Sequence, residues 1–346
     1  MIPRRESTGW RRELAAALTD PAELLALLEL PAELLEGARR AGGAFPLRVP
    51  RGFAARMRKG DPRDPLLAQV LPLGIEMAPV RGFGADPLGE AQARRERGLL
   101  HKYQGRVLLV LTGACAVHCR FCFRRHFPYA DEQLGARGWS EALATIAADP
   151  SIEEVILSGG DPLSLPDGPL AELAESLEAI PHLSRLRLHT RQPVVLPERV
   201  DDDLLAWLSR GRLAKVIVLH TNHAREIDGT VADALARLRS AGLHLLNQTV
   251  LLRGVNDSVE ALAELSLRLF EVGVLPYYLH LLDRVAGAAH FDLPEAEARS
   301  LAAGLAARLP GYLVPRLVRE VPGAPAKVPV PIELHDLPQP QGTETP

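Results

Sequence analysis

Residues 106–122 read RVLLVLTGACAVHCRFC, an apolar run that passes directly into a loop with three cysteines. The run at 106–112 is rich in Val and Leu, which is typical of a buried β-strand. Cys115, Cys119 and Cys122 follow it with the spacing C-x3-C-x2-C. They therefore lie at the carboxyl end of a predicted strand, the edge at which barrels of alternating strands and helices place their ligands.

The same rhythm of a short apolar run and a longer amphipathic stretch continues along the chain. Further strands are predicted at 154–157, 185–189, 215–220, 244–252 and 274–280, and helices at 139–148, 170–180, 201–208, 232–241, 258–272 and 294–309. Most of the helical segments begin near Asp, Ser or Pro, residues that favour helix starts. Alternation of this kind predicts a parallel sheet with right-handed crossovers. We therefore expect an α/β fold, a partial (β/α)6 barrel of the TIM type.

The chain of 346 residues is longer than such a barrel requires. Residues 11–40 predict two or three short helices, and 41–100 are punctuated by Pro and Gly in a way that is typical of irregular structure. The expected parts are a helical and irregular N-terminal extension at 1–95 that wraps the core, the barrel at 96–310, a C-terminal segment at 311–337 and a disordered tail at 338–346.

The composition, with 47% hydrophobic and 24% charged residues, is that of a globular protein. A net charge of −3 with both signs interspersed argues against nucleic-acid or membrane-surface binding. Acidic residues interrupt every N-terminal apolar run before it reaches the length of a signal peptide or a membrane span, so we expect a cytoplasmic protein. The three cysteines lie within eight residues of one another, which suits metal ligands in a reducing compartment better than disulfides.

The cysteine loop has two chemical interpretations. Thiolates suit iron–sulfur clusters, and three of them on a four-iron cluster leave one iron open to a small molecule. The alternative is a zinc site completed by His118 or His126, as in a zinc-stabilised binding module without turnover. The spacing and position of Cys115, Cys119 and Cys122 resemble the signature of the radical S-adenosylmethionine (SAM) superfamily. The resemblance implies that these cysteines hold a [4Fe–4S] cluster that binds SAM.

A second segment supports this interpretation. Ser158, Gly159, Gly160 and Asp161 follow the next predicted strand, and two glycines allow the backbone to pass close to a ligand. Taken alone, the segment is an ordinary tight turn. At this place it resembles the Gly-Gly-Glu segment with which the superfamily grips the amino group of SAM, with Asp161 in place of Glu.

Polar side chains also stand at or near the ends of the later predicted strands. Among these side chains, we expect His220 and Gln248 to contact SAM as well. Singly, each is as well explained as a satisfied loop residue. Several strand ends that present polar groups at the same edge predict one shared pocket.

From about residue 90 to 332 the chain resembles the lysine 2,3-aminomutase family, and within it the short bacterial members that make β-lysine for the modification of translation elongation factor P. The segments that carry the resemblance are HKY at 101–103, CRFCFRRHFPY at 119–129, SGGDPL at 158–163, TRQP at 190–193, NQTVLLRGVND at 247–257 and GAAHF at 287–291. It implies an isomerase that converts L-lysine to (R)-β-lysine with a [4Fe–4S] cluster, SAM and pyridoxal 5'-phosphate.

The family binds pyridoxal phosphate through a lysine in a C-terminal stretch rich in Gly and Pro. The matching stretch here is REVPGAPAKVP at 319–329, which makes Lys327 the catalytic, coenzyme-binding lysine. A run of glycines in the family is Gly-Ala-Pro-Ala here, so the chain departs from the family pattern at residues 323–326. We also expect Arg106, with Lys102, to bind the coenzyme phosphate. Without the resemblance, Lys327 would be interpreted as a solvated loop lysine.

The resemblance also implies how the substrate is held. Arg124, two positions after the third cysteine, matches the arginine that pairs with the substrate carboxylate. Asp283 and Glu320 match the two acids that hold the side-chain ammonium of lysine. Catabolic members have Asp at the second position, so the longer Glu320 predicts a shifted pocket. Without the resemblance, Arg124 would be interpreted as a solvated loop charge and Asp283 as a turn or cap residue.

The partners implied are L-lysine, a functional link to the ligase that lysylates elongation factor P, and an external electron donor of the flavodoxin or ferredoxin type. No nucleic-acid or membrane partner is expected, and a homodimer stays open. The alternatives are a catabolic lysine aminomutase and an aminomutase for another amino acid. Catabolic members carry a further segment with metal-binding cysteines, whereas this chain ends about 19 residues after Lys327 without another Cys, which favours the translation-factor role.

Overall fold

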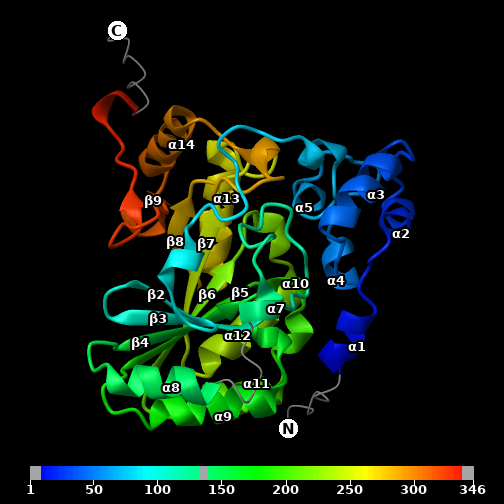
Figure 1. The fold of residues 1–346 in the computed structure, drawn as a ribbon. Coiled ribbons are helices and arrows are strands. Elements are labelled where there is room, and N and C mark those ends of the chain that lie inside the picture. The colour runs from blue at the N-terminus through cyan, green and yellow to red at the C-terminus, as the bar shows by residue number, and fades with distance from the viewer. Residues whose placement is uncertain (1–8, 133–138, 337–346) are drawn as a thin grey trace.

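A single curved sheet organises the computed structural model, which describes residues 9–132 and 139–336 (Figure 1). Its strands follow one another in chain order: β1 (Arg94–Glu96), β2 (Leu99–Tyr103), β3 (Arg106–Thr112), β4 (Glu154–Gly159), β5 (Arg185–Thr190), β6 (Ala214–His220), β7 (His244–Val250), β8 (Leu275–His280), β9 (Arg316–Arg319) and β10 (Val328–Pro329). Strands β3 to β9 pair in parallel, while β1, β2 and β10 join antiparallel at the two ends. The expected α/β partial barrel is therefore confirmed.

The helices that the structure describes either precede the sheet in the chain, as α1 to α6 do, or lie between its strands. They are α1 (Gly9–Ala15), α2 (Pro21–Leu27), α3 (Leu34–Ala44), α4 (Arg51–Ala54), α5 (Pro65–Ala68), α6 (Glu90–Ala93), α7 (Tyr129–Glu132), α8 (Trp139–Ala148), α9 (Asp167–Glu178), α10 (Gln192–Val195), α11 (Asp202–Leu208), α12 (Gly229–Ser240), α13 (Val259–Glu271) and α14 (Glu295–Arg308). Short 3-10 turns are η1 (Gly74–Met77), η2 (Pro162–Ser164), η3 (Pro197–Arg199), η4 (Ala224–Glu226), η5 (Ala289–Phe291), η6 (Gly311–Leu313) and η7 (Leu334–Asp336).

The helices that follow the parallel strands form where the sequence predicts them. Polar side chains cap their first turns: Asp201 accepts from Leu204 N at 2.9 Å, and Ser258 accepts from Ala261 N at 3.2 Å. Apolar side chains from β3 to β7 and from α8, α9, α11 and α12 share one buried cluster. This cluster lies outside the barrel, between sheet and helices, so the inside of the barrel is left for a site.

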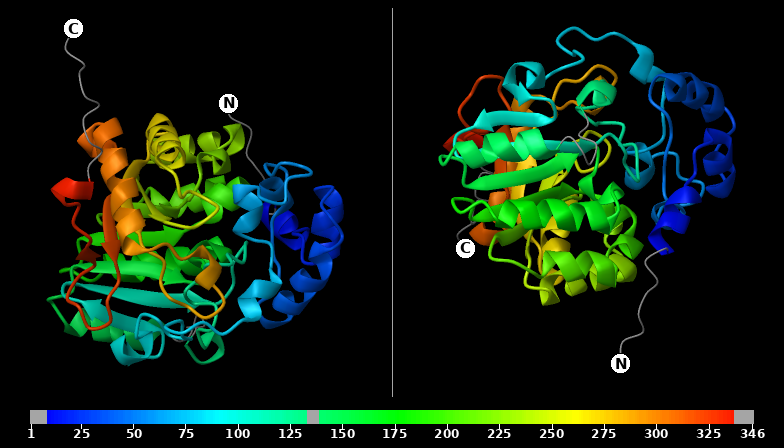
Figure 2. Two further views of the ribbon diagram at one scale, coloured as in Figure 1. Left: turned by 90° about the horizontal axis from the view of Figure 1, so that it is seen from above. Right: turned by 60° about the horizontal axis from the view of Figure 1, so that its bottom comes forward.

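The N-terminal segment packs against the cysteine loop. Helices α1 to α5 lie together on one side of the barrel (Figure 2). Their apolar side chains share a second buried cluster with Ala116 and Val117 of the cysteine loop and with Val195 and Leu196 after β5. Folding of this segment is therefore coupled to the shape of the loop that carries the cysteines.

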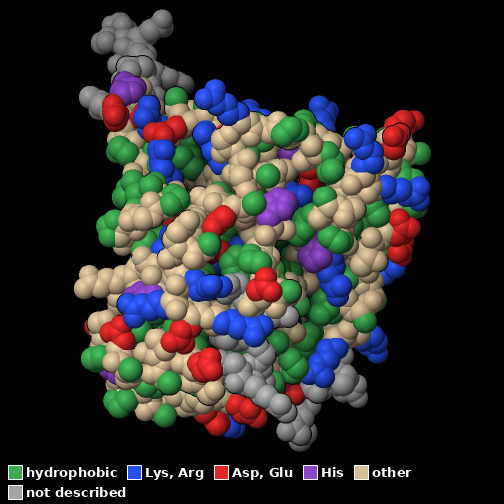
Figure 3. All heavy atoms as spheres, viewed as in Figure 1, with side chains coloured by type: hydrophobic (Ala, Val, Ile, Leu, Met, Phe, Trp, Pro, Cys, Tyr) green, Lys and Arg blue, Asp and Glu red, His purple; other side chains and the backbone are tan. Residues whose placement is uncertain are grey.

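The differences from prediction concern short strands. β1, β2, β9 and β10 were not predicted, because they are short and lie at the two ends of the sheet, where burial is incomplete and the apolar pattern is weak. The tail predicted at 338–346 lies outside the described residues. In the part of the chain that is described, no helix has the length and apolar character of a membrane span. The face in Figure 3 carries basic and acidic side chains among apolar ones.

Candidate active site

The side chains predicted to form a site come together around one cavity. Its volume is about 630 Å3, and it is lined by inward-facing residues of the parallel strands and by the loops at their carboxyl ends. The lining includes Lys102, Arg106, Cys115, Cys119, Cys122, Arg124, Ser158, Gly159, Gly160, Asp161, His220, Gln248, Asp283, Glu320 and Lys327. Their individual contacts with cofactors or substrate stay predictions.

The cysteine loop rests directly on the two glycines that end β4. The Gly160 amide donates to Thr112 O at 2.6 Å, and the Asp161 amide donates to Ala114 O at 2.8 Å. A Cβ atom at Gly160 would lie 2.5 Å from Ala114 O, and Gly159 has a φ of 130°. Only glycine fits both constraints. The pair therefore shapes the cysteine loop as well as the ligand cavity.

The zinc interpretation depends on His118 or His126 as a fourth ligand. Cys115, Cys119 and Cys122 all line the cavity, and within the described residues no three His, Cys, Asp or Glu side chains are arranged to hold one metal ion. The histidines that zinc would need are engaged with backbone oxygens: His118 Nδ1 lies 2.9 Å from Pro46 O, and His126 Nε2 lies 3.1 Å from Ala286 O. Each contact takes up one ring nitrogen of its histidine, and His118 lines the cavity together with the three thiols.

Burial opposes ionisation of two of the three thiols. It raises the pKa of Cys122 to about 12 and that of Cys115 above its ordinary range, and the charge of Asp161 adds to the effect at Cys115 while Arg124 opposes it at both. Iron ligation requires thiolates. The cationic irons of a cluster would therefore displace these protons.

Asp161 is engaged by the protein itself. Its carboxylate accepts from Thr190 Oγ1 at 2.8 and 2.9 Å, from Leu163 N at 3.0 Å and from Arg191 N at 2.8 Å, with a further bond from Gln192 N at 3.2 Å. This carboxylate ties the end of β4 to the end of β5. Because the Asp161 side chain is engaged in this way, we expect the backbone of residues 158–160 to contact SAM in its place. The contact predicted between SAM and the Asp161 side chain stays a prediction.

Arg124 already holds a carboxylate of the protein. Its Nε and Nη2 donate to Glu90 at 2.8 and 2.6 Å, while Nη1 donates to Ser158 Oγ at 3.0 Å and to Gly159 O at 3.1 Å. Both partners are buried. A guanidinium has five N–H donors, so these contacts leave one N–H of Nη2 for a further acceptor. The Glu90 carboxylate occupies the fork in the way that a substrate carboxylate would.

At the other side of the cavity, Glu320 gathers three donors. It pairs with the Lys327 ammonium, accepts from the Tyr103 hydroxyl, and pairs with Lys102 at 3.1 Å. Burial would raise the pKa of Glu320, but the two lysines outweigh it and lower that pKa to about 2. Burial also lowers the pKa of Lys327, against the opposing charge of Glu320 and Asp283. A lowered pKa makes the amine a better nucleophile.

The pKa of Asp283 is not lowered by neighbouring lysines in the way that the pKa of Glu320 is. Burial, together with the neighbouring negative charge of Glu320, raises its pKa to about 7, although Lys327 and Lys102 oppose the shift. Glu320 and Asp283 thus form a pair of acids beside Lys327, and only Glu320 is firmly ionised at neutral pH. A further cation in the cavity would favour ionisation of both.

The remaining predicted contacts also have defined places. The Arg106 guanidinium lies over the Tyr103 ring, 4.6 Å from its centre, and Lys102 is paired with Glu320. The Gln248 amide lies 2.8 Å from His220 Nε2. Burial, with the charges of nearby arginines and of Lys327, lowers the pKa of His220 to about 3. His220 is therefore a neutral imidazole that can accept a hydrogen bond.

No individual role was predicted from the sequence for three residues of the site. Tyr103 and Arg191 stand in segments that carry the family resemblance, and each makes a hydrogen bond to a predicted site residue. The family resemblance of these two segments is the sequence signal that could have identified Tyr103 and Arg191. Glu90 stands in a stretch punctuated by Pro and Gly without periodic pattern, and its pairing with Arg124 depends on contacts 34 residues apart in the chain.

Comparison with known proteins agrees with this geometry. Residues 109–266 match the Radical SAM superfamily model. The chain is 51% identical over 334 residues to the L-lysine 2,3-aminomutase of Escherichia coli, covering 96% of both chains. It is 48% identical to the enzyme of the same name from Haemophilus influenzae, covering 93% of this chain and 96% of that one. The Clostridium subterminale L-lysine 2,3-aminomutase is 33% identical, with 93% of this chain and 77% of that one covered.

Proposed function

Because this chain belongs to the lysine 2,3-aminomutase family of radical SAM enzymes, we propose that it isomerises L-lysine to (R)-β-lysine. The observation that carries the proposal is a single cavity with three thiols on one side and, on the other, Lys327 beside two acids. When bound, the cluster and SAM supply a carbon radical, and pyridoxal phosphate supplies a conjugated ring for the migrating nitrogen.

The chain's own residues hold these groups in place. Cys115, Cys119 and Cys122 would ligate the cluster, and Lys327 would bind the coenzyme covalently. Arg106 is the better candidate for the coenzyme phosphate, because the Lys102 ammonium is already paired with Glu320. Apolar side chains such as Leu108, Ile156 and Leu246 also line the cavity, and they would limit the access of water to the radical.

Glu320 would pair first with the ammonium of Lys327 and later with the side-chain ammonium of the substrate. In the free chain it pairs with the Lys327 ammonium. While Lys327 holds the coenzyme it would no longer offer a free ammonium, so one oxygen of Glu320 could accept from another cation. We propose that the side-chain ammonium of L-lysine takes that place, with Asp283 as its second partner. The incoming cation then favours the ionised form of Asp283.

Arg124 would hold the substrate carboxylate through its remaining N–H, while Glu90 keeps the guanidinium oriented. A dibasic amino acid matches the two acids Glu320 and Asp283, and its carboxylate would take the single N–H of Arg124 that Glu90 leaves free. A neutral or acidic side chain would give Asp283 no cationic partner and would leave Glu320 with Lys102 and Tyr103 only, which is less favourable.

The proposal extends to the cellular role. We infer that the β-lysine serves the modification of elongation factor P through its lysylation ligase, in the cytoplasm, with electrons from a flavodoxin or ferredoxin. The support is the resemblance to the short bacterial members. Comparison of β-lysylated elongation factor P in cells with and without this gene product tests the role, since a catabolic enzyme would leave that modification unchanged.

A panel of amino acids tests the substrate. Reduced, oxygen-free protein is incubated with SAM, pyridoxal phosphate and lysine, arginine, ornithine or glutamate, and the products are identified by mass spectrometry with chiral separation. We expect (R)-β-lysine as the main product. Turnover of glutamate but not lysine would contradict the roles proposed for Asp283 and Glu320.

A further inference from the structure

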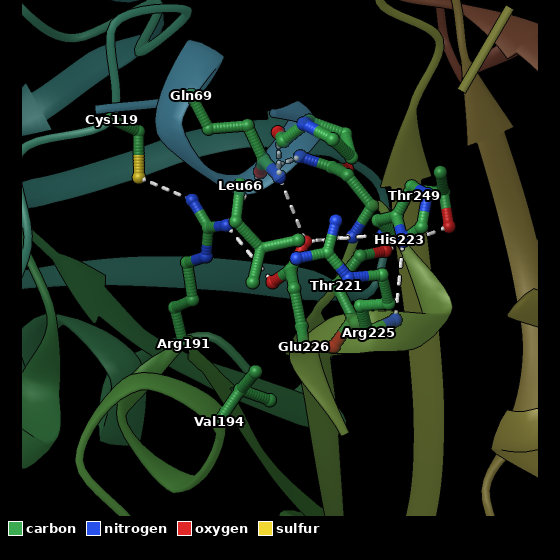
Figure 4. A network of polar contacts seen from close by, with 12 residues as sticks. Leu66, Gln69, Cys119, Arg191, Val194, Thr221, His223, Arg225, Glu226 and Thr249 are labelled. Atoms are coloured by element: carbon green, nitrogen blue, oxygen red, sulfur yellow. Dashed lines mark hydrogen bonds and ion pairs between the residues drawn. The ribbon is translucent and has the colours of Figure 1, made fainter. Parts of the chain in front are cut away.

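We propose that Arg191 tunes the cluster: its buried guanidinium donates a hydrogen bond to the sulfur of Cys119 and makes reduction of the cluster easier. The inference rests on the proposed cluster. Nη1 of Arg191 lies 2.8 Å from Cys119 Sγ. Figure 4 shows the guanidinium directed at this sulfur from the end of β5, with Gln69 and Glu226 on its other side.

A buried set of hydrogen bonds holds the guanidinium in this position. Nη2 of Arg191 donates to Gln69 Oε1 at 2.6 Å and pairs with Glu226 Oε2 at 3.0 Å. Gln69 Nε2 donates in turn to Glu226 Oε1 at 3.0 Å, and Asn222 Nδ2 donates to Gln69 Oε1 at 3.0 Å. Arg191 is 5% exposed, and Gln69 and Glu226 are fully buried. The direction of the N–H toward sulfur is therefore fixed by the fold.

The network also reaches the cysteine loop through the backbone. Gln69 follows α5, whose N-cap Asp64 accepts from Leu66 N and Leu67 N at 2.9 and 3.1 Å. The carbonyl oxygen of Gln69 accepts from Arg120 N, next to Cys119, at 2.8 Å. The same residue thus positions both the loop and the guanidinium.

The positive charge of Arg191 decides whether the midpoint potential of the cluster is raised or lowered. Reduction adds one electron, from a donor of the flavodoxin or ferredoxin class, and makes the cluster with its three thiolates more negative by one unit. A positive N–H donor at a ligating sulfur stabilises the more negative state. The aromatic rings of Phe53 and Phe121 flank the guanidinium at 5.6 and 5.5 Å, and a low local dielectric strengthens the interaction.

The experiment compares the midpoint potential of the cluster in wild type, R191Q and R191K. Protein reconstituted with iron and sulfide without oxygen is titrated with dithionite, and the signal of the reduced cluster is followed by electron paramagnetic resonance (EPR). We expect a more negative midpoint in R191Q, which lacks the charge, and a smaller shift in R191K, which keeps it. R199Q is the matched control, because Arg199 is equally buried but pairs with Asp167 and not with a cysteine. It should lower stability without moving the midpoint.

Equal midpoints in wild type and R191Q at equal iron content would overturn the inference and leave the proposed function intact. Wild-type protein without iron would overturn both. If R191Q does not fold, wild type labelled with 15N-arginine decides the question by pulsed EPR. We expect a 15N coupling to the reduced cluster that is lost in R191K, and an unchanged coupling in R191K would overturn the inference.

Discussion

Lys327 and Glu320 show how one residue can have two partners in turn. Free Lys327 is neutralised by Glu320, so the coenzyme site and the predicted site for the substrate ammonium share a carboxylate. The family resemblance identified both residues, but the pairing between them depends on β9 and β10. These strands bring residues 319 and 328 together across the sheet edge, and they are too short to be predicted from pattern.

Lys327→Arg tests whether residue 327 is needed for its positive charge or for its covalent bond to the coenzyme. Arginine keeps a positive partner for Glu320, but it stays protonated and forms no covalent bond with the coenzyme. We expect normal folding and iron content, loss of the coenzyme absorbance after gel filtration, and loss of at least about a thousandfold in β-lysine formation. An unchanged absorbance spectrum would show that another lysine binds the coenzyme.

Asp283 predicts a pH dependence. Because its pKa is raised to about 7, this carboxyl is protonated below that pH and then cannot hold a cationic side chain. We expect kcat/KM for lysine to fall by up to about tenfold per pH unit as the pH drops below the pKa of Asp283 in the coenzyme-bound enzyme. Asp283→Asn should lower kcat/KM at pH 8 and remove this part of the profile. A profile that is flat from pH 6 to 8 in wild type would be inconsistent with the role of Asp283.

The same raised pKa lowers stability as the pH rises. Between pH 3.8 and about 7 the folded state binds the proton of Asp283 more tightly than the unfolded state, so the free energy of unfolding decreases through this window. At pH 8 we expect Asp283→Asn to raise the free energy of unfolding of the coenzyme-free protein by about 1 to 4 kcal/mol. Asp233→Asn, at an exposed position of α12, is the control and should change it little.

At the scale of elements, the parallel strands were predicted well and their carboxyl ends less well. β3 ends where predicted, because Gly113 breaks the apolar run. β4 continues to Gly159, two residues past the predicted end, since Gly159 adopts a backbone conformation that other residues avoid. The contact of Gly160 with the cysteine loop is invisible in the sequence, because it joins residues 46 positions apart.

Gly160→Ala tests this contact. The added methyl group would meet Ala114 O at 2.5 Å, so the backbone of the cysteine loop must shift. We expect a loss of about 1 to 3 kcal/mol in stability and incomplete iron incorporation after reconstitution. Gly168→Ala in α9 is the matched control, since its Cβ meets nothing within 4 Å and alanine favours a helix. Equal iron content in both variants would contradict the proposed contact.

At the scale of the whole molecule, the N-terminal segment is part of the site. Glu76 of η1 accepts from Arg120 Nε at 2.9 Å and pairs with Arg125 Nη2 at 2.8 Å, and the three side chains are buried. Composition and pattern indicated a wrapping segment, and its helices were expected. That it supplies buried partners for the cysteine loop was not predicted, because such partners are defined only by the folded chain.

Glu76→Gln should therefore weaken the whole molecule. It leaves two buried guanidinium groups without a negative partner, at a cost of about 3 to 5 kcal/mol in the free energy of unfolding. Glu23→Gln is the control, because Glu23 pairs with Arg51 at the surface and should contribute less than about 1 kcal/mol. Chemical denaturation of both variants measures the difference, and equal stabilities would show that the buried pairing contributes little.

The pH dependence of the same group has a defined sign. Burial would raise the pKa of Glu76, but Arg120 and Arg125 outweigh it and lower that pKa below 4.5. Its contribution to stability is complete above pH 4.5 and is lost as the pH falls through the lowered pKa. Wild type should therefore approach the stability of Glu76→Gln under strongly acidic conditions.

The central claim is that three thiolates leave one iron open to SAM inside the cavity that holds Lys327. The most direct test is the EPR spectrum of oxygen-free, reduced protein before and after SAM is added. We predict the signal of a [4Fe–4S] cluster whose shape changes when SAM binds, and no such signal in Cys119→Ala. A wild-type protein without iron, or a cluster whose spectrum ignores SAM, would contradict the account.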